Sequence, residues 1–196
     1  MKTYKEFFEY NRKWAAESEA SDPDFFSKLA EGQNPGFLYI GCSDSRVPAE
    51  EVTGARPGEL FVHRNIANVV DPSDPNAMAV IDFSVRHLKV RHIVVCGHYL
   101  CGGVRASMET GIGGSLDPWL DRIRNVAHKN QEELSAISDK EQRALRLVEI
   151  NVEAQCRNVA KVPVVRDAFQ ATGMPRVHGW VFDIRTGELI DLNIKL

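Results

Sequence analysis

The sequence lacks any apolar run that approaches the roughly 20 residues a helix needs to cross a bilayer. Its N-terminal stretch, MKTYKEFFEYNRKW, also lacks the continuous apolar core of a secretory signal peptide. There is no long block of basic residues, and the formal net charge is −3. We therefore expect a cytoplasmic protein that binds neither a membrane nor nucleic acid.

Repeats, low-complexity stretches and linkers rich in Pro, Gly or Ser are missing as well. The chain has 196 residues, which fits one large domain on a typical size of about 150 residues. Cysteine is scarce, with four in the chain. In a reducing compartment such thiols more often bind metal, catalyse or fill core than form disulfides. We expect residues 1–196 to form a single domain that folds without disulfides.

Strand patterns alternate with helix patterns along most of the chain. Short apolar runs between turn residues predict strands at 36–42, 58–65, 92–98, 176–184 and 188–194. Apolar residues at helical spacing predict helices at 74–89, 102–110, 116–131, 139–160 and 163–172. This alternation favours an α/β fold with a mostly parallel central β-sheet flanked by helices.

The first 33 residues predict a helical arm that is rich in aromatic side chains. Two helical patterns occur here, and the second ends before Gly32. The aromatic residues suit packing against the body of the same chain or against a partner chain. Both possibilities remain open at this level.

The motif GHYLCGG places His98 and Cys101 three residues apart, at the end of the expected strand 92–98. A second expected strand, 36–42, ends in Cys42. In an open parallel sheet, ligands bind beyond the carboxyl ends of the strands. If these two strands are neighbours, Cys42, His98 and Cys101 converge at one edge of the sheet.

Two thiolates and one imidazole suit zinc, and two thiolates balance the charge of the ion. Structural zinc sites usually have four protein ligands, whereas catalytic sites keep the fourth position for water. The other two cysteines, Cys96 and Cys156, lie in an apolar strand pattern and a helical pattern, where we expect them to fill core. The sequence therefore predicts one Zn²⁺ per chain in a site with an open fourth position.

The motif CSDSRV places Asp44 and Arg46 directly after the first expected ligand. A nearby guanidinium keeps a carboxylate ionised, and such a carboxylate can orient a zinc-bound hydroxide by accepting its hydrogen bond. The alternative is a surface ion pair of little energetic value. Gly102 begins the expected helix 102–110, where exposed N–H groups attract anions and glycine lets a small substrate approach. A plain turn is the alternative there.

The motifs CSDSRV, HRNIAN and GHYLCGGV together resemble those of the β-class carbonic anhydrases. The resemblance spans nearly the whole chain, from the N-terminal helices to the HGW segment. It implies that Cys42, His98 and Cys101 hold zinc, and that Asp44 and Arg46 form a dyad beside the metal. It also implies a dimer in which the N-terminal arm lies over the partner, and dimers that often pair into tetramers.

The reaction that this resemblance implies is the reversible hydration of CO₂ to bicarbonate and a proton, by attack of zinc-bound hydroxide on CO₂. Asp44 would accept the hydrogen bond of the hydroxide while Arg46 holds Asp44. The backbone N–H of Gly102 is a candidate donor to a substrate oxygen. CO₂ is apolar, so Val47 and Phe61 are candidates for its pocket, with plain core packing as the alternative.

Some members of the family close the site, because the aspartate leaves the arginine and takes the fourth zinc position. In those members bicarbonate binds a second pocket built from a tryptophan, an arginine and a tyrosine. Here the matching arginine is Arg64, but Tyr39 and Phe182 stand at the other two positions. Because two of the three residues differ, we expect weak bicarbonate binding and a site that stays open, with Asp44 on Arg46.

Two other classes of protein remain open on the residues alone. One is a phosphatase or sulfurtransferase with Cys42 as nucleophile and Arg46 as oxyanion binder, although the signatures of those enzymes place the arginine further from the cysteine. The other is a non-catalytic zinc module that Asp44 closes permanently. A relative with the same site that acts on CS₂ or COS is a third possibility that the sequence does not separate.

Overall fold

The structure is a computed structural model that describes residues 2–196. The chain divides into two compact units, one that ends at Gln33 and one that spans Asn34–Leu196. The first unit consists of the helices α1 (Tyr4–Ser21) and α2 (Phe25–Ala30). Within residues 2–196, no helix is both long enough and apolar enough to cross a membrane.

The helix α1 carries a set of exposed aromatic side chains. It begins with a capping box, in which the Thr3 hydroxyl accepts from the backbone N–H of Glu6 and the Glu6 carboxylate accepts from that of Thr3. No residue of this helix is buried. Its large apolar side chains include Tyr4, Phe7 and Tyr10, which are 78%, 61% and 59% exposed. By itself, this unit leaves an apolar surface of a kind that monomeric proteins rarely expose.

The second unit is built on a five-stranded sheet with the strand order β2-β1-β3-β4-β5. The strands are β1 (Phe37–Cys42), β2 (Leu60–Asn65), β3 (His92–His98), β4 (Arg176–Asp183) and β5 (Glu188–Asp191). The first four run parallel to one another, and β5 pairs with β4 in the antiparallel sense. The central strands β1 and β3 are buried almost throughout, which explains why their sequences are continuous apolar runs.

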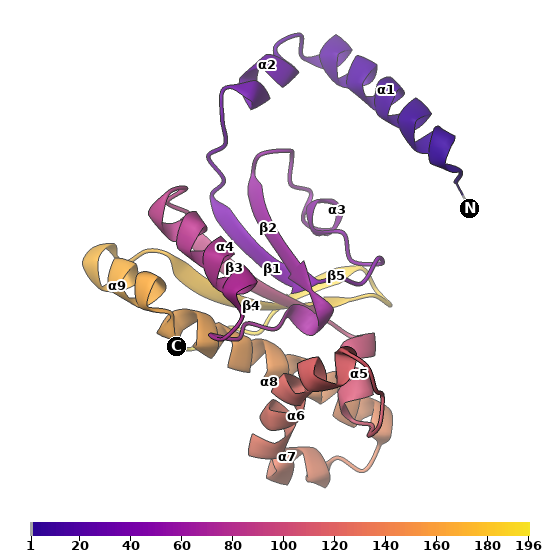
Figure 1. Cartoon of the computed structure of the whole chain (residues 1–196), viewed down its shortest axis with the longest axis vertical. Helices are drawn as coiled ribbons and strands as arrows, with labels where there is room; N and C mark the ends of the chain where they lie inside the picture. Colours follow the sequence, from indigo (N-terminus) through magenta and orange to yellow (C-terminus); the bar gives the residue numbers. More distant parts are fainter. Residues whose placement is uncertain (1) are drawn as a thin grey trace. The chain divides into compact units, whose positions relative to one another are not determined.

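Except for α3 (Ala49–Thr53), the helices of this unit contribute to the apolar core on one face of the sheet. They are α4 (Pro75–Arg86), α5 (Gly102–Ser107), α6 (Leu116–Lys129), α7 (Gln131–Ala136), α8 (Lys140–Lys161) and α9 (Pro163–Thr172), with a short 3₁₀ helix η1 (Ile66–Asn68). Figure 1 shows α8 running along β3 and β4, which it contacts, with α4 and α9 packed together beside it. The main apolar core lies between these helices and the sheet.

The opposite face of the sheet carries a smaller apolar cluster. Its buried members include Tyr39, Val94 and Phe182, and α3 contributes to it. A cavity of about 500 Å³ opens on this face, lined in part by Phe37 and Trp180. Within Asn34–Leu196 this face is therefore only partly covered.

The predicted fold class is confirmed, as is each of the five expected strands to within a few residues at its ends. Three elements differ from expectation. The helices α3 and η1 were not predicted, because pieces of five and three residues are too short to show a helical period. The pattern at 116–131 ends at Lys129, and the chain turns at Asn130 into the separate helix α7.

Candidate metal centre and its surroundings

The three expected zinc ligands converge at one edge of the sheet. The strands β1 and β3 are neighbours and run parallel, so Cys42 and His98, at their carboxyl ends, lie side by side. Cys101 follows two residues after Tyr99 and directly precedes α5. All three side chains are buried, and their ligand atoms lie within 4.8 Å of one another.

The Sγ atoms of Cys42 and Cys101 lie 3.9 Å apart, within hydrogen-bond distance for sulfur. The hydrogen bond from the Cys101 thiol lowers the pKa of Cys42 well below its usual value, and the same bond raises the pKa of Cys101. The backbone N–H of Ala67 also donates to Cys42 Sγ, at 3.4 Å. Two sulfur atoms this close, with a backbone donor on one of them, form a donor set in which a cation can take the place of the thiol protons.

The imidazole of His98 is oriented for metal binding. Its Nδ1 lies 2.9 Å from the backbone carbonyl oxygen of Tyr99, so this nitrogen carries the proton and donates it. Its Nε2 is buried and has no hydrogen-bond partner among residues 2–196. A second hydrogen bond that fixes the tautomer in this way is typical of histidines that bind metal.

These features fit zinc. Two thiolates placed about 2.3 Å from one ion at a tetrahedral angle lie about 3.8 Å apart, close to the separation of the two sulfur atoms here. The orphaned Nε2 of His98 provides the third donor. A parallel α/β sheet with this buried Cys-His-Cys set at its strand ends defines a zinc enzyme.

Asp44 and Arg46 lie next to the ligands and bind each other. Arg46 donates from Nε to Oδ1 at 2.9 Å and from Nη2 to Oδ2 at 2.7 Å, and its backbone N–H also donates to Oδ1. These bonds lower the pKa of the Asp44 carboxyl far below its usual value. Oδ2 of Asp44 lies 3.7 Å from Nε2 of His98, so a fixed carboxylate faces the place where the ligands converge.

Arg64 braces the same loop from the neighbouring strand β2. Its Nε donates to the backbone oxygen of Cys42 at 2.7 Å, and its Nη2 donates to the backbone oxygen of Asp44 at 2.6 Å. The guanidinium thus ties β2 to the backbone oxygen at the end of β1 and to that of Asp44, which also accepts from the N–H of Val47. The motif CSDSRV is held in shape by a residue that the sequence suggested only as an anion binder.

The other two residues of the expected anion site are buried. Tyr39 is 1% exposed, and its hydroxyl has no hydrogen-bond partner in the described part of the chain. Burial raises the pKa of this phenol far above its usual value. Phe182 lies on β4, pairs in register with His98 and is 8% exposed. Both side chains belong to the smaller apolar cluster behind the zinc ligands.

The three expected substrate-pocket residues lie in different surroundings. Gly102 is exposed at the start of α5, one residue after Cys101. Val47 is 2% exposed and closes the turn after Asp44 with a backbone hydrogen bond. Phe61 pairs in register with Leu38, four residues before the end of β1, so it lies about 13 Å along the strand from that end. Within one chain, the structure brings Gly102 and Val47 near the ligands but not Phe61.

Reasoning from the sequence missed the two backbone groups that serve the ligands, the carbonyl of Tyr99 and the N–H of Ala67. Neither interaction depends on the side chain of its residue, so residue type carried little signal. The only hint was position, because Tyr99 separates the two ligands of GHYLCGG and Ala67 lies in HRNIAN.

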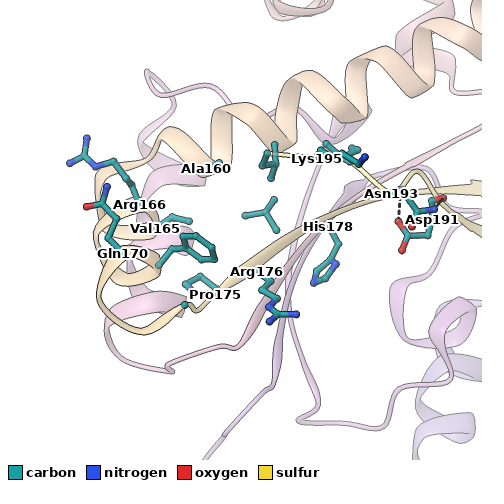
Figure 2. A pocket seen from close by; sticks show the side chains of 15 residues that line it. Ala160, Val165, Arg166, Gln170, Pro175, Arg176, His178, Asp191, Asn193 and Lys195 are labelled. Atoms are coloured by element: carbon teal, nitrogen blue, oxygen red, sulfur yellow. Dashed lines mark hydrogen bonds between the residues drawn. The ribbon is translucent and has the colours of Figure 1, made fainter.

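A cavity of about 920 Å³ lies away from this centre (Figure 2). Side chains of α9, of the start of β4 and of the segment 191–196 line it, among them Arg176 and His178. Arg176 begins β4, whereas Phe182, near the other end of that strand, pairs with the ligand His98. Cavity size therefore does not identify the reaction site of this protein. The metal donor set Cys42, His98 and Cys101 identifies it.

Comparison with known proteins agrees with the site. The family model described as carbonic anhydrase matches residues 37–189. A carbonic anhydrase of Emericella nidulans is 55% identical over 192 residues, which cover 98% of this chain and 84% of that one. A tetrameric β-carbonic anhydrase of Sordaria macrospora superposes with a TM-score of 0.93 at 45% identity, covering 97% of this chain and 96% of that one. A β-carbonic anhydrase of Aspergillus fumigatus gives 0.94 at 40% identity, covering 98% and 92%.

The chain belongs to the carbonic anhydrase family, and within it to the β class. It is a zinc enzyme that catalyses the reversible hydration of carbon dioxide to bicarbonate and a proton. The expected family, reaction and zinc ligands are thereby confirmed.

Proposed function

We propose that Asp44 and Arg46 form the catalytic dyad and that the site stays open at neutral pH. The observation that carries this proposal is the two-pronged bond from Arg46 to Asp44, with the carboxylate 3.7 Å from Nε2 of His98. A carboxylate in this position accepts a hydrogen bond from the reacting oxygen and sets its direction. Because Arg46 occupies both carboxylate oxygens, Asp44 remains an anion and is kept from swinging toward the metal.

Zinc held by Cys42, His98 and Cys101 supplies a Lewis acid that lowers the pKa of a coordinated water, as is established for carbonic anhydrases in general. The residues of the chain supply orientation. The Arg46 guanidinium lies half-exposed, and it also reaches the backbone oxygen of Leu100 at 3.4 Å. Arg46 thus links the loop after β1 to the loop between the second and third ligands, and it fixes the dyad relative to both.

The substrate enters beside this dyad. The backbone N–H of Gly102 is our candidate donor to an oxygen of the substrate, because it lies exposed directly after Cys101. An ideal Cβ on Gly102 would meet no atom within 4 Å, so the space beside it is free for a small molecule. Val47 offers apolar surface next to Asp44, and a pocket role for Phe61 remains a prediction.

The open state is supported by the surroundings of Arg64. Both of its bonds go to backbone oxygens of Cys42 and Asp44, so the guanidinium already has partners. Tyr39 is enclosed at 1% exposure, and Phe182 offers no polar atom. An anion in this place would bind with few hydrogen bonds, and each lost bond to a charged group costs about 1.5–3 kcal/mol.

We also propose that the enzyme assembles as a dimer or tetramer of identical chains. The aromatic surface of α1 and the partly covered sheet face around Phe37 and Trp180 are apolar surfaces that a partner would bury. The Sordaria relative is described as tetrameric. Sedimentation analysis of the full chain should give a dimer or a tetramer. A double variant, Phe7→Ser with Phe8→Ser, should shift the chain toward smaller species, and a wild-type monomer would refute the assembly.

Stopped-flow CO₂ hydration on the zinc-loaded protein tests the proposal for the dyad. We expect turnover that depends on Asp44 and simple inhibition by bicarbonate. Activity that does not respond to Asp44→Asn would remove the dyad from the mechanism.

A further inference from the structure

The segment Ile66–Asn68, which joins β2 to the helices beyond it, has an unusual backbone. Ala67 and Asn68 both adopt the left-handed conformation, with φ of 62° and 49°. Residues other than glycine rarely adopt this conformation, and they persist in it only where their surroundings hold them there. Both residues are buried, at 0% and 2% exposure.

This backbone aims one peptide group at the metal centre. The N–H of Ala67 points to Cys42 and lies 3.4 Å from its Sγ. A hydrogen bond to a thiolate stabilises the negative sulfur and withdraws part of the charge that the sulfur would give to a metal. The strained segment therefore places a donor on a zinc ligand, and it does so with the backbone alone.

The same peptide group is held from its other side by Trp119 of α6. The indole Nε1 of Trp119 donates to the carbonyl oxygen of Ile66 at 2.9 Å. This carbonyl and the N–H of Ala67 belong to one peptide unit. A peptide that accepts a bond at its oxygen is polarised and becomes a better donor at its nitrogen. The bonds from Trp119 and to Cys42 thus form one chain through a single peptide.

The next peptide unit is held by Asn151 of α8. Its Nδ2 donates to the carbonyl oxygen of Ala67 at 3.1 Å, and its Oδ1 accepts from Nε2 of Gln155 at 2.9 Å. Asn151 is 1% exposed, so these bonds are shielded from water. Gly103 completes the packing, because a Cβ there would come within 2.7 Å of Ile66 Cγ2.

We infer that Trp119 and Asn151 are positioning residues of the zinc centre, because they fix the two peptide groups on either side of Ala67 so that its N–H binds Cys42 Sγ. Both residues act through the backbone and touch neither the metal site nor the substrate. The inference depends on Cys42 as a zinc ligand and is independent of the roles proposed for Asp44 and Arg46.

Cobalt substitution tests this inference with a readout that responds to the sulfur itself. In the Co²⁺-loaded protein, the sulfur-to-cobalt charge-transfer band reports the energy of the thiolate electrons. The variant Trp119→Phe keeps an aromatic ring and removes the indole N–H. We expect this band to move to lower energy in Trp119→Phe, and turnover of the zinc enzyme to fall about tenfold, the lower end of typical effects for groups that support metal ligands.

A matched control weakens the attachment of α6 and leaves the hydrogen bond to the Ile66–Ala67 peptide group in place. Arg122 of α6 binds Asp71, in the segment that follows η1, and it also lies over the Trp119 ring. The variant Asp71→Asn weakens this tether and leaves the indole N–H in place. Its charge-transfer band and turnover should match those of the wild type. Equal shifts in Trp119→Phe and Asp71→Asn would show that only the docking of α6 matters and would overturn the inference for Trp119.

Asn151 is tested by a nearly isosteric pair of variants on α8. Asn151→Asp keeps the acceptor for Gln155 and replaces the donor to Ala67 by a negative oxygen. Asn158→Asp is the control, because Asn158 donates to the backbone oxygen of Val70 at 2.9 Å and to Oε1 of Gln155 at 3.1 Å, so this variant disturbs the same network but keeps the donor to Ala67. We expect the band to shift in Asn151→Asp and not in Asn158→Asp. An unshifted band in folded Asn151→Asp overturns its assignment. If that variant does not fold, Trp119→Phe decides alone, since its side chain is only partly buried.

Discussion

Arg46 donates hydrogen bonds to both carboxylate oxygens of Asp44, which lies only two positions earlier in the chain. The guanidinium and the backbone N–H of Arg46 make three bonds to this carboxylate, at 2.7–3.0 Å. The local turn therefore fixes the carboxylate without help from another element. The bonds also hold the pKa of Asp44 well below its usual range. The sign follows directly: the ion pair is present throughout the neutral range and is lost only as the pH falls through that lowered pKa.

The first prediction concerns this carboxylate. Asp44→Asn keeps the size of the side chain but weakens the acceptor and removes the charge that pairs with Arg46. We expect CO₂ hydration to fall at least about tenfold, which corresponds to roughly 1.4 kcal/mol of barrier, while the zinc content stays unchanged. Stopped-flow rates and elemental analysis on the same preparation provide the check.

The chain contains its own control for that experiment. Asp183 and Arg185 repeat the arrangement, with bonds from the Arg185 backbone, Nε and Nη2 at 2.9, 2.9 and 2.8 Å. Asp183→Asn breaks a similar turn at the end of β4 and should leave turnover near the wild-type value. An equal loss in Asp44→Asn and Asp183→Asn would mean that a general loosening of the fold, and not the dyad, explains the effect.

The second prediction concerns the ligands. We expect about one zinc per chain, and we expect Cys42→Ser, His98→Ala and Cys101→Ala each to lose most of it, because each removes a donor from a three-residue set. Cys156→Ala is the matched control, since this cysteine is also buried but lies on α8 and donates to the backbone of His178. Full zinc retention in Cys101→Ala would show that this residue is not a ligand.

Much of this site could be predicted because its residues stand where the apolar strand patterns end. Cys42 and His98 each end a continuous apolar run, and parallel neighbours bring such ends together. The prediction still required the assumption that β1 and β3 are adjacent, although β2 lies between them in the chain. The register that confirms this pairing is a long-range property, and no local pattern contains it.

The segment around Ala67 shows what a sequence pattern does not reveal. Left-handed turns are normally indicated by glycine, and HRNIAN has none. Here the side chain of Asn65 stabilises the turn instead. It donates to the backbone oxygen of Val69 and accepts from the backbone N–H of Val69, both at 2.8 Å. Donors from α6 and α8 complete it. Tertiary contacts thus set a backbone shape that local propensity opposes.

The third prediction concerns the glycine before His98. A Cβ on Gly97 would lie 2.6 Å from Val152 Cγ2 and 3.3 Å from Val148 Cγ1, so this glycine lets α8 approach β3 closely. Gly97→Ala should overpack this contact and cost about 1–3 kcal/mol of unfolding free energy. In a chain of this size, each kcal/mol lowers the melting temperature by about 2–4 °C.

Gly36→Ala is the control for that substitution, because a Cβ there would meet no atom within 4 Å and its backbone needs no positive φ. Thermal melts of the two variants, both loaded with zinc, should separate clearly. Equal melting temperatures would show that α8 can move to accept the methyl group. Close packing of α8 on β3 would then not explain why residue 97 is glycine.

The last prediction concerns regulation by bicarbonate, and it follows from the partners of Arg64. Its Nε and Nη2 already donate to the backbone oxygens of Cys42 and Asp44, Tyr39 is enclosed, and Phe182 has no polar atom. An anion bound here would have little to hold it, so the closed state would lack its stabilising ligand. We therefore expect activity to rise with pH as a single smooth titration and bicarbonate to inhibit without a sigmoid response. A steep, cooperative loss of activity toward neutral pH would contradict the open site. A crystal structure near neutral pH with a carboxylate oxygen of Asp44 at about 2.0–2.2 Å from zinc, or with bicarbonate on Arg64, would contradict it as well.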